Sequence, residues 1–391
     1  MLVALGLIVL IGLSAVYSAT WDEPGKHWLK QAVYLVAGVI ASGLVFLIPP
    51  KVFYAMAYPA WVLSLFPLLY IIIFKANSVE RWIALPGGFN LQPSELTKVA
   101  LLLAMARLLA FQPISVSRPK TLVAPALLFF FPFILVLNQP NLSTALSFVA
   151  MTGVMAYWSG LTLREIFLLA SPVISVALSF HNLAWAAMFI VLILIVILSR
   201  INLKVGALLL LVNIIAGFGA IFVWNRILYE HQRSRILTFI DPQRDPLGAG
   251  YQVLQSKVAI GSGQLFGKGY LNGTQTNLSF LPEEHTDFIF SVWSEQFGFL
   301  GCLFLLALYL FLLNRILHTG IDIRNRFVSL VGAGVAGILG FHIVVNVSMT
   351  IGLMPVTGLP LPFMSYGGSF LISCLLMIGI LVNLKAHGHN L

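Results

Sequence analysis

The sequence predicts an all-α polytopic membrane protein in which about twelve transmembrane helices form one bundle and one large loop extends from it. Of the 391 residues, 59% are hydrophobic and only 9% are charged, whereas soluble proteins are typically about 25% charged. The apolar residues form long continuous runs, and a run of about 20 residues is enough for a helix to cross a membrane. A membrane β-barrel would show short alternating segments, so these runs predict helices.

Twelve apolar runs follow one another along the chain. We expect them to form helices near 1–18, 30–48, 53–75, 93–111, 121–138, 142–159, 165–181, 183–199, 204–225, 287–313, 328–352 and 369–386. No cationic stretch precedes the first run, so a spanning helix is expected there rather than a signal peptide. Cys302 and Cys374 both lie inside apolar runs, which predicts neither a disulfide framework nor a zinc site. Residues 1–391 are therefore expected to form a single membrane domain.

The charges between the runs orient the predicted bundle. The net charge is +9, but the cations lie in short loops rather than in a basic domain, which argues against nucleic-acid binding. Alternate loops are richer in Lys and Arg, and the richer loops are expected in the cytoplasm. Both termini are then cytoplasmic and the loop at about 226–286 is external. This loop also contains many apolar residues, so we expect it to fold against the outer mouth of the bundle.

Ionisable side chains at the outer ends of the spans are the first candidates for function, because a charge in the membrane is costly unless it is paired or hydrated. Asp287 lies where the external loop enters an apolar run. An N-cap is an equally good interpretation of its position alone. Glu295 follows about two helical turns later, on nearly the same predicted face, and two carboxylates on one face favour a functional site.

A second polar cluster precedes the run at 93–111. Glu95 and Lys98 are three positions apart and can pair on one helix face. An internal ion pair that locks the bundle is the favoured interpretation of this spacing. Arg81 and Trp82 combine a cation with an amphipathic ring, which alone fits an anchor at the membrane interface.

Irregular backbone is predicted within the membrane at 354–369. This segment contains three prolines and three glycines, which break a helix. Irregular backbone at membrane depth is tolerated only against protein or a watery cavity. A structural re-entrant turn is therefore one interpretation, and it is compatible with the wall of a cavity. The chain contains no HExxH, Walker or GxSxG pattern.

These motifs together resemble the SEDS family (shape, elongation, division and sporulation proteins, with branches FtsW, RodA and SpoVE). The matching stretches are 81–83, 92–95 with Lys98, 139–140 with Thr144, 241–242, 245–248, 250–252, 255–257, 259–261, 281–282, 285–290, 360–362 and 365–369. They follow the expected order through most of the chain. Residues 267–269, 272–275 and 355–358 resemble the elongation branch, RodA, more than the division branch, FtsW.

The chain also departs from the family pattern. Relatives usually carry an acid and a glycine where this chain has Asn141 and Ser143, so an acidic role there is in doubt. Relatives often have a second Glu where this chain has Gln296. Most relatives have ten spans, so the resemblance implies an additional helical hairpin within 165–221.

The resemblance implies a peptidoglycan glycosyltransferase that polymerises lipid II during cell elongation and rod-shape maintenance. Members transfer a growing glycan from undecaprenyl pyrophosphate to the 4-hydroxyl of an incoming GlcNAc. The essential acid of the family matches Asp287, as general base or as ligand of a divalent cation such as Mg²⁺ or Mn²⁺, with no organic cofactor. Contacts to the pyrophosphate are expected from Arg81, Lys98, Arg233 and Lys257. The residues expected to shape the cavity are Trp82, Glu95, Glu295 and Ser365.

The partners and location implied by the resemblance are those of bacterial cell-wall synthesis. They are a class B penicillin-binding protein that acts as transpeptidase, elongation machinery of the MreB, MreC and MreD type, lipid II, and the lipids of the inner (cytoplasmic) membrane. Two alternatives remain open, a lipid II flippase and a non-catalytic scaffold. A flippase would need polar residues through the full depth of the bundle, whereas here they cluster at the outer end. A scaffold predicts that Asp287 is dispensable.

Overall fold

The fold comes from a computed structural model that describes residues 1–21, 27–74, 81–85, 89–139, 141–199, 202–226, 249–277, 283–322 and 325–387. Each of the twelve predicted runs forms a helix. They are α1 (Leu2–Thr20), α2 (His27–Phe46), α3 (Pro50–Phe74), α4 (Pro93–Phe111), α5 (Lys120–Leu137), α6 (Leu142–Trp158), α7 (Leu163–Leu178), α8 (Asn182–Leu198), α9 (Leu203–Arg226), α13 (Ile289–Asp322), α14 (Arg326–Thr350) and α15 (Gly368–His387). The chain is thus a polytopic membrane protein.

Eight of these helices are long and apolar enough to cross a membrane by length and composition alone. The other four are α4, α6, α7 and α8. Helices α6, α7 and α8 are shorter, with 16 or 17 residues each. Helix α4 carries three charged side chains, those of Glu95, Lys98 and Arg107, and it is nevertheless enclosed by other helices.

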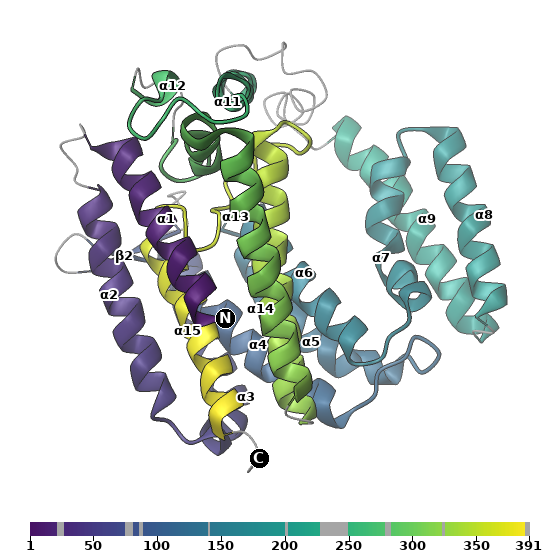
Figure 1. Cartoon of the computed structure of the whole chain (residues 1–391). Coiled ribbons are helices and arrows are strands. Elements are labelled where there is room, and N and C mark those ends of the chain that lie inside the picture. Colours follow the sequence, from purple (N-terminus) through teal and green to yellow (C-terminus); the bar gives the residue numbers. More distant parts are fainter. Residues whose placement is uncertain are drawn as a thin grey trace.

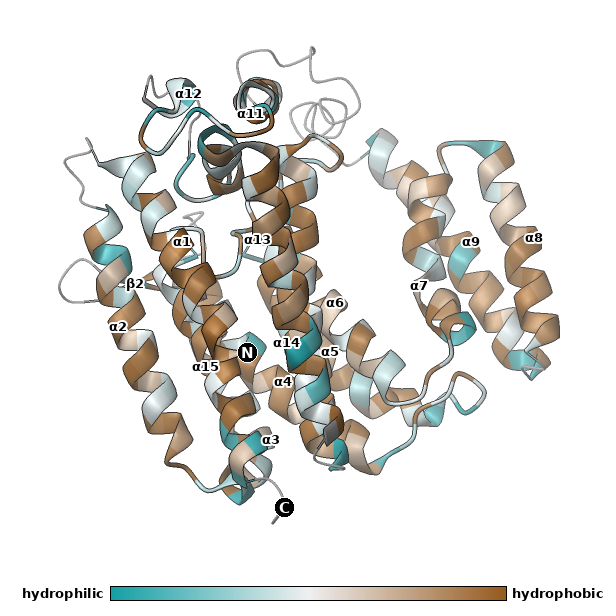
Figure 2. Ribbon diagram, viewed as in Figure 1, coloured by the Kyte–Doolittle hydropathy of each residue, from teal (hydrophilic) through white to brown (hydrophobic). Residues whose placement is uncertain are grey.

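Helices α14 and α15 form the centre of the main bundle (Figure 1). In both, 72% of the span residues are buried, against 11% in α2 and α5. Helix α15 packs along α2, and α14 packs along α6 and α13. Close approach to α14 depends on glycine, because a side chain at Gly334 would overlap Leu102 of α4 and Met155 of α6. Figure 2 shows apolar residues along the helices and many of the hydrophilic residues near the helix ends.

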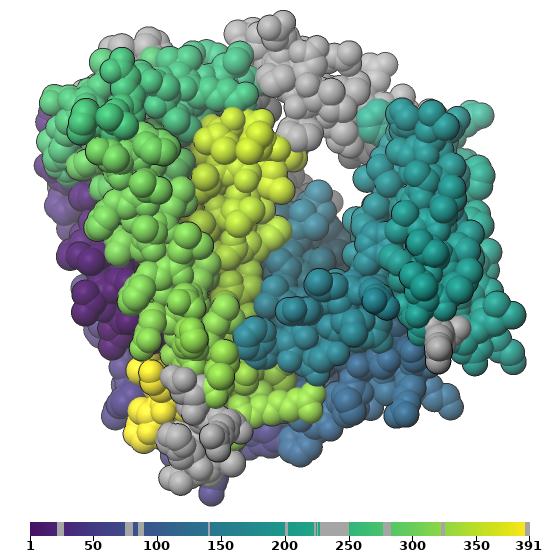
Figure 3. All heavy atoms as spheres, turned by 45° about the vertical axis from the view of Figure 1, so that its right-hand side comes forward, coloured from purple at the N-terminus to yellow at the C-terminus, as the bar shows by residue number. Residues whose placement is uncertain are grey.

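Helices α7, α8 and α9 form a separate group beside the main bundle. A small hydrophobic cluster around Leu168, Met188 and Leu192 holds them together, and it also includes Val116 from the segment between α4 and α5. Polar contacts also join them, because Trp185 Nε1 donates to Ser175 Oγ at 2.7 Å. The group meets the main bundle through α6 and α7 and through the segment between α4 and α5, where Ser115 and Val116 donate to Glu165. The space-filling view shows an opening beside it (Figure 3). The helical prediction for 165–221 is confirmed, and the idea that two of these helices are additional stays a prediction.

The loop that was predicted to be external folds against one end of the bundle over its described residues. It forms α11 (Ala249–Ser262) and the short α12 (Thr274–Asn277) (Figure 1). Ser256 anchors α11, because its hydroxyl lies 2.7 Å from Ser291 Oγ and donates to Thr350 O at 2.7 Å. The C-terminus of α15 lies at the opposite end of the bundle.

Helix α13 differs from the single uninterrupted run that the sequence predicted. It extends past residue 313 to Asp322, and it breaks at Gly298, where φ is +65°. The loop inserts its backbone at this break, since Lys268 N donates to Glu295 O and Phe299 N donates to Gln264 O. A side chain at Gly298 would collide with the loop backbone at Leu265. The break therefore exposes peptide groups that fasten the loop to the bundle.

A short hairpin was not predicted. Strands β1 (Ile83–Leu85) and β2 (Phe89–Leu91) pair antiparallel just before α4. Ser369 at the start of α15 holds this hairpin, accepting from Gln92 N and donating to Asn90 O, both at 3.0 Å. Two strands of three residues carry too little alternation to be recognised from sequence.

Candidate active site

Asp287 is half-buried in the turn just before α13. The turn is closed by backbone hydrogen bonds from Thr286 N and Asp287 N to Glu283 O. Asn346 of α14 fixes its position, because its side-chain Nδ2 donates to Asp287 O and to Leu359 O, both at 2.8 Å. One amide thus joins the turn to the irregular segment after α14.

The carboxylate of Asp287 faces this irregular segment. Its Oδ2 lies 3.2 Å from the point where a Cβ on Gly358 would stand, and Gly358 has a φ of +68°. Glycine is the residue that adopts such a φ without strain, and its missing side chain leaves space in front of the carboxylate. No hydrogen bond in the described residues joins this carboxylate to the first turn of α13. The geometry therefore favours a functional acid over the N-cap interpretation.

The surroundings of Asp287 raise its pKa. Burial contributes most, the negative charge of Glu283 adds to it, and a hydrogen bond from Thr286 opposes it, which together bring the pKa from the usual 3.8 to about 6. Burial removes water that would stabilise the ionised form, and a like charge nearby acts in the same direction. A carboxylate with this pKa is mostly ionised at neutral pH and is a stronger proton acceptor than an ordinary aspartate.

Glu95 and Lys98 form the ion pair that the sequence predicted. The distance from Lys98 Nζ to Glu95 Oε1 is 2.8 Å, and both side chains are buried. Ser373 Oγ donates to Glu95 Oε2 at 3.1 Å, and His342 Nε2 lies 3.5 Å from Lys98 Nζ. Lys98 is thus enclosed between α4, α14 and α15, with its charge balanced by Glu95.

The ion pair and Asp287 reach the same irregular segment. His342 Nδ1 lies 3.1 Å from Pro360 O, two residues after the glycine that faces Asp287. Ser143 also contacts this segment, because its hydroxyl donates to Thr357 O. The residues at 357–360 therefore lie between the buried Glu95–Lys98 pair and Asp287.

Of the other predicted cations, Lys257 and Arg81 lie in the described residues. Lys257 of α11 is exposed, and its aliphatic stem lies against Gly352, where any side chain would collide with it. Arg81 is partly exposed and Trp82 is 40% exposed, both at the start of the hairpin. Arg233 lies outside the described residues. Of the predicted pyrophosphate contacts, Lys257 and Arg81 are therefore accessible and Lys98 is enclosed.

Glu295 has a different role from the one expected. Its Oε1 accepts from Lys268 Nζ at 2.6 Å, Thr274 N at 2.9 Å and Gln275 N at 3.1 Å. The side chain is fully buried. It therefore anchors the segment around α12, and the structure does not bring it together with Asp287.

Ser365 also stabilises backbone. Its Oγ accepts from Leu361 N at 2.7 Å, and its carbonyl accepts from Gln31 Nε2 at 3.0 Å. Ser365 is buried, and its hydrogen bonds stabilise the backbone of the irregular segment and join it to Gln31 of α2. The segment is irregular, as predicted, and Ser365 satisfies part of its backbone.

The sequence did not predict a cluster of three rings, those of His27, His285 and Tyr366, near Asp287 in the chain. The ring centroids of His27 and His285 are 4.8 Å apart, and that of Tyr366 lies 5.0 Å from His27. Tyr366 N donates to His285 O at 2.9 Å. The motif at 285–290 places His285 two residues before Asp287, but no sequence pattern indicates that the start of α2 joins it.

The fold and the site define a polytopic membrane protein with a half-buried acid at the end of the bundle where the loop folds. A family model of cell cycle proteins, that of FtsW, RodA and SpoVE, matches residues 1–187 and 181–390. The chain belongs to the FtsW/RodA/SpoVE family, as its motifs predicted.

Similar proteins match over nearly their whole length. "Peptidoglycan glycosyltransferase MrdB" of Escherichia coli K12 is 36% identical over 393 residues, covering 97% of this chain and 92% of the relative. "Peptidoglycan glycosyltransferase RodA" of Treponema pallidum is 33% identical over 412 residues, covering 96% and 94%. These relatives carry the activity that the motifs implied.

Solved structures share the fold. A chain from "Structural coordination of polymerization and crosslinking by a peptidoglycan synthase complex" matches with a TM-score of 0.73 at 29% identity, covering 98% of this chain and 96% of that chain. The rod shape determining protein RodA of Thermus thermophilus matches with a TM-score of 0.64 at 27% identity, covering 98% and 95%.

Proposed function

We propose that this protein is a peptidoglycan glycosyltransferase that polymerises lipid II during cell elongation, with Asp287 as its general base. The observation that carries the proposal is the half-buried carboxylate of Asp287, which faces Gly358 at the end of the bundle where the loop folds and has a pKa raised to about 6. The names of the relatives support the activity. The substrate has a lipid tail and a polar head, so it must reach this end of the bundle from the membrane.

In the proposed reaction, the carboxylate of Asp287 accepts the proton of the acceptor's 4-hydroxyl. The freed oxygen forms a bond to the anomeric carbon of the growing glycan. The bond from that carbon to the pyrophosphate oxygen breaks, and undecaprenyl pyrophosphate leaves with the electron pair. Lys257 and Arg81 are accessible cations for the leaving group, and charge-assisted hydrogen bonds to phosphate are strong.

A divalent cation, Mg²⁺ or Mn²⁺, is compatible with this site as a companion of the substrate. Among the described residues, no group of three or more His, Cys, Asp or Glu could hold a metal ion. Magnesium is commonly held by one or two carboxylates together with substrate phosphates and waters. Asp287 with the pyrophosphate is a ligand set of this kind, and the cation would neutralise charge on the leaving group. Asp287 would then act as ligand, and the base would be a different group.

The proposal includes a location and partners. The cation-rich loops favour an orientation with both termini in the cytoplasm and Asp287 outside, in the bacterial inner membrane. A class B penicillin-binding protein is the proposed partner, supported by the structural similarity to a chain of a peptidoglycan synthase complex. Machinery of the MreB, MreC and MreD type is proposed from the family resemblance.

The decisive experiment measures glycan polymer formation from lipid II by the purified protein with its penicillin-binding partner. Asp287→Asn should lower the rate by about 10²–10⁴-fold, the usual contribution of a general base. The variant should fold, because a neutral amide avoids burying a charge at this position.

The control is Glu165→Gln, which alters a carboxylate at the start of α7, away from Asp287. It should leave polymer formation near that of the wild type. Equal polymer from the wild type and a folded Asp287→Asn protein would remove Asp287 from the mechanism. Polymer from neither would favour the flippase, to be measured as transfer of labelled lipid II across vesicles.

A further inference from the structure

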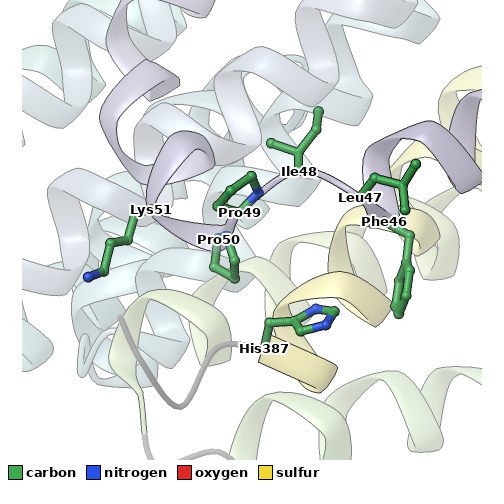
Figure 4. A pocket seen from close by; sticks show the side chains of 7 residues that line it. All are labelled: Phe46, Leu47, Ile48, Pro49, Pro50, Lys51 and His387. Atoms are coloured by element: carbon green, nitrogen blue, oxygen red, sulfur yellow. The ribbon is translucent and has the colours of Figure 1, made fainter.

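Two adjoining pockets lie at the end of the bundle opposite Asp287. The first, of about 560 Å³, is formed by the turn at 46–51 between α2 and α3 and by His387 at the end of α15 (Figure 4). The second, of about 600 Å³, is formed by Lys51 and Tyr54 of α3, the end of α4 and the start of α14. Lys51 lines both pockets and therefore stands between them.

The pockets lie where helices end, at the membrane surface. Helices α2 and α3 both qualify as spans, and only residues 47–49 separate them. Asn383 of α15 holds this turn, donating to Phe46 O and Ile48 O, both at 2.8 Å. The turn is thus fixed in place, so the first pocket has a rigid wall.

The pockets are cationic. Lys51 is exposed and forms no ion pair or hydrogen bond within the described residues. Arg326, also exposed, borders the second pocket and donates through Nη2 to Ser159 O at 2.9 Å, which leaves its other N–H groups available. No Asp or Glu lines either pocket. A ligand that fills them therefore meets positive charge with no competing carboxylate.

The cations stand beside exposed apolar side chains. Leu47 is 77% exposed in the first pocket, and Phe111 is 74% exposed in the second. Inorganic phosphate would bind the cations and leave Leu47 and Phe111 exposed to water. A molecule with an anionic head and hydrocarbon chains would use both, and basic pockets between membrane helices are suited to such head groups.

We propose that the joined pockets bind an anionic phospholipid, with its phosphate beside Lys51 and its acyl chains against Leu47 and Phe111. The site is separate from the proposed reaction, because it lies at the other end of the bundle. It gives this end of the protein a specific contact with the membrane leaflet around it.

Native mass spectrometry of the purified full-length protein tests the proposal, using phosphatidylglycerol and phosphatidylcholine of identical acyl chains. Phosphatidylglycerol should bind and phosphatidylcholine should not. Lys51→Ala should weaken phosphatidylglycerol binding about fivefold, the usual contribution of one lysine near an anionic surface. Lys51 has no partner in the described residues, so its loss should not alter the unfolding temperature.

The matched control is Lys204→Ala, which removes another exposed lysine at the start of a helix, outside both pockets. It should leave binding unchanged. An equal loss in both variants would mean general surface charge and would overturn the proposal, as would equal binding of phosphatidylcholine. Displacement of the lipid by millimolar inorganic phosphate would also overturn it, because the acyl contacts would then contribute nothing.

Discussion

Asp287 and the two candidate lysines differ in what surrounds them. Asp287 is partly desolvated, with Glu283 as a like-charged neighbour. Lys98 is buried against Glu95 at 2.8 Å, while Lys257 is exposed on α11. Removing one partner of a buried ion pair leaves an uncompensated charge, so Lys98 is needed for stability whether or not it also contacts substrate. Among these lysines, Lys257 is the one that can meet a pyrophosphate without rearrangement of the bundle.

The pKa of Asp287 predicts how activity depends on pH. A general base works only when ionised, so polymer formation should fall as the pH drops through about 6. Glu283→Gln removes a negative neighbour that raises the pKa, so this acidic limb should move to lower pH. Thr286→Val removes a hydrogen bond that lowers the pKa, so the limb should move to higher pH. Initial rates of glycan polymerisation between pH 4.5 and 8 check both shifts.

The opposite directions of these two shifts make each variant the control for the other. Movement of both limbs in the same direction would point to a general disturbance of the turn. An acidic limb that neither variant moves would mean that a group other than Asp287 titrates in the reaction.

At the level of elements, α13 and the loop between α9 and α13 depend on each other. The break at Gly298 leaves peptide groups of α13 for the loop backbone to bond. The buried carboxylate of Glu295 accepts hydrogen bonds from five loop residues, which are Ser262, Lys268, Thr274, Gln275 and Thr276. Since α11 is anchored to Thr350 of α14 through Ser256, the loop is fastened to both helices that flank Asp287.

Glu295→Gln should loosen this segment. The amide keeps one acceptor oxygen and loses the charge, and a hydrogen bond to a charged group contributes about 1.5–3 kcal/mol. Amide hydrogen exchange at 268–277 should therefore become about tenfold faster or more. Exchange in the middle of α14 should stay the same, because its packing does not involve Glu295.

Glu165→Gln provides the matched comparison. Glu165 accepts from Ser115 Oγ at 2.8 Å, Val116 N at 2.9 Å and Thr162 N at 3.1 Å. Its loss should speed exchange around Ser115 and leave 268–277 unchanged. If Glu295→Gln leaves the exchange at 268–277 as slow as in the wild type, Glu295 is not the anchor of the loop.

For the molecule as a whole, hydropathy was enough to find all twelve long helices, because lipid allows few other backbone structures. The three-residue spacing of Glu95 and Lys98 at the start of an apolar run predicted their ion pair, which the structure shows at 2.8 Å. Other features depend on tertiary contacts. The break in α13 lies where the loop backbone bonds to it. The contacts of Glu295 with Lys268, Thr274 and Gln275 join residues about 20 or more positions apart. His27 reaches His285 only through the packing of α2.

The orientation of the whole protein gives the last prediction. Phe266, 75% exposed between α11 and α12, should face outward, and Lys51 should face the cytoplasm with the other cations. Both natural cysteines are buried, so they give little background for thiol labelling. In intact spheroplasts, a membrane-impermeant maleimide should label Phe266→Cys, and it should label Lys51→Cys only after permeabilisation. The reverse pattern would place Asp287 on the cytoplasmic side, where it could not extend glycan outside the membrane, and would contradict the proposed function.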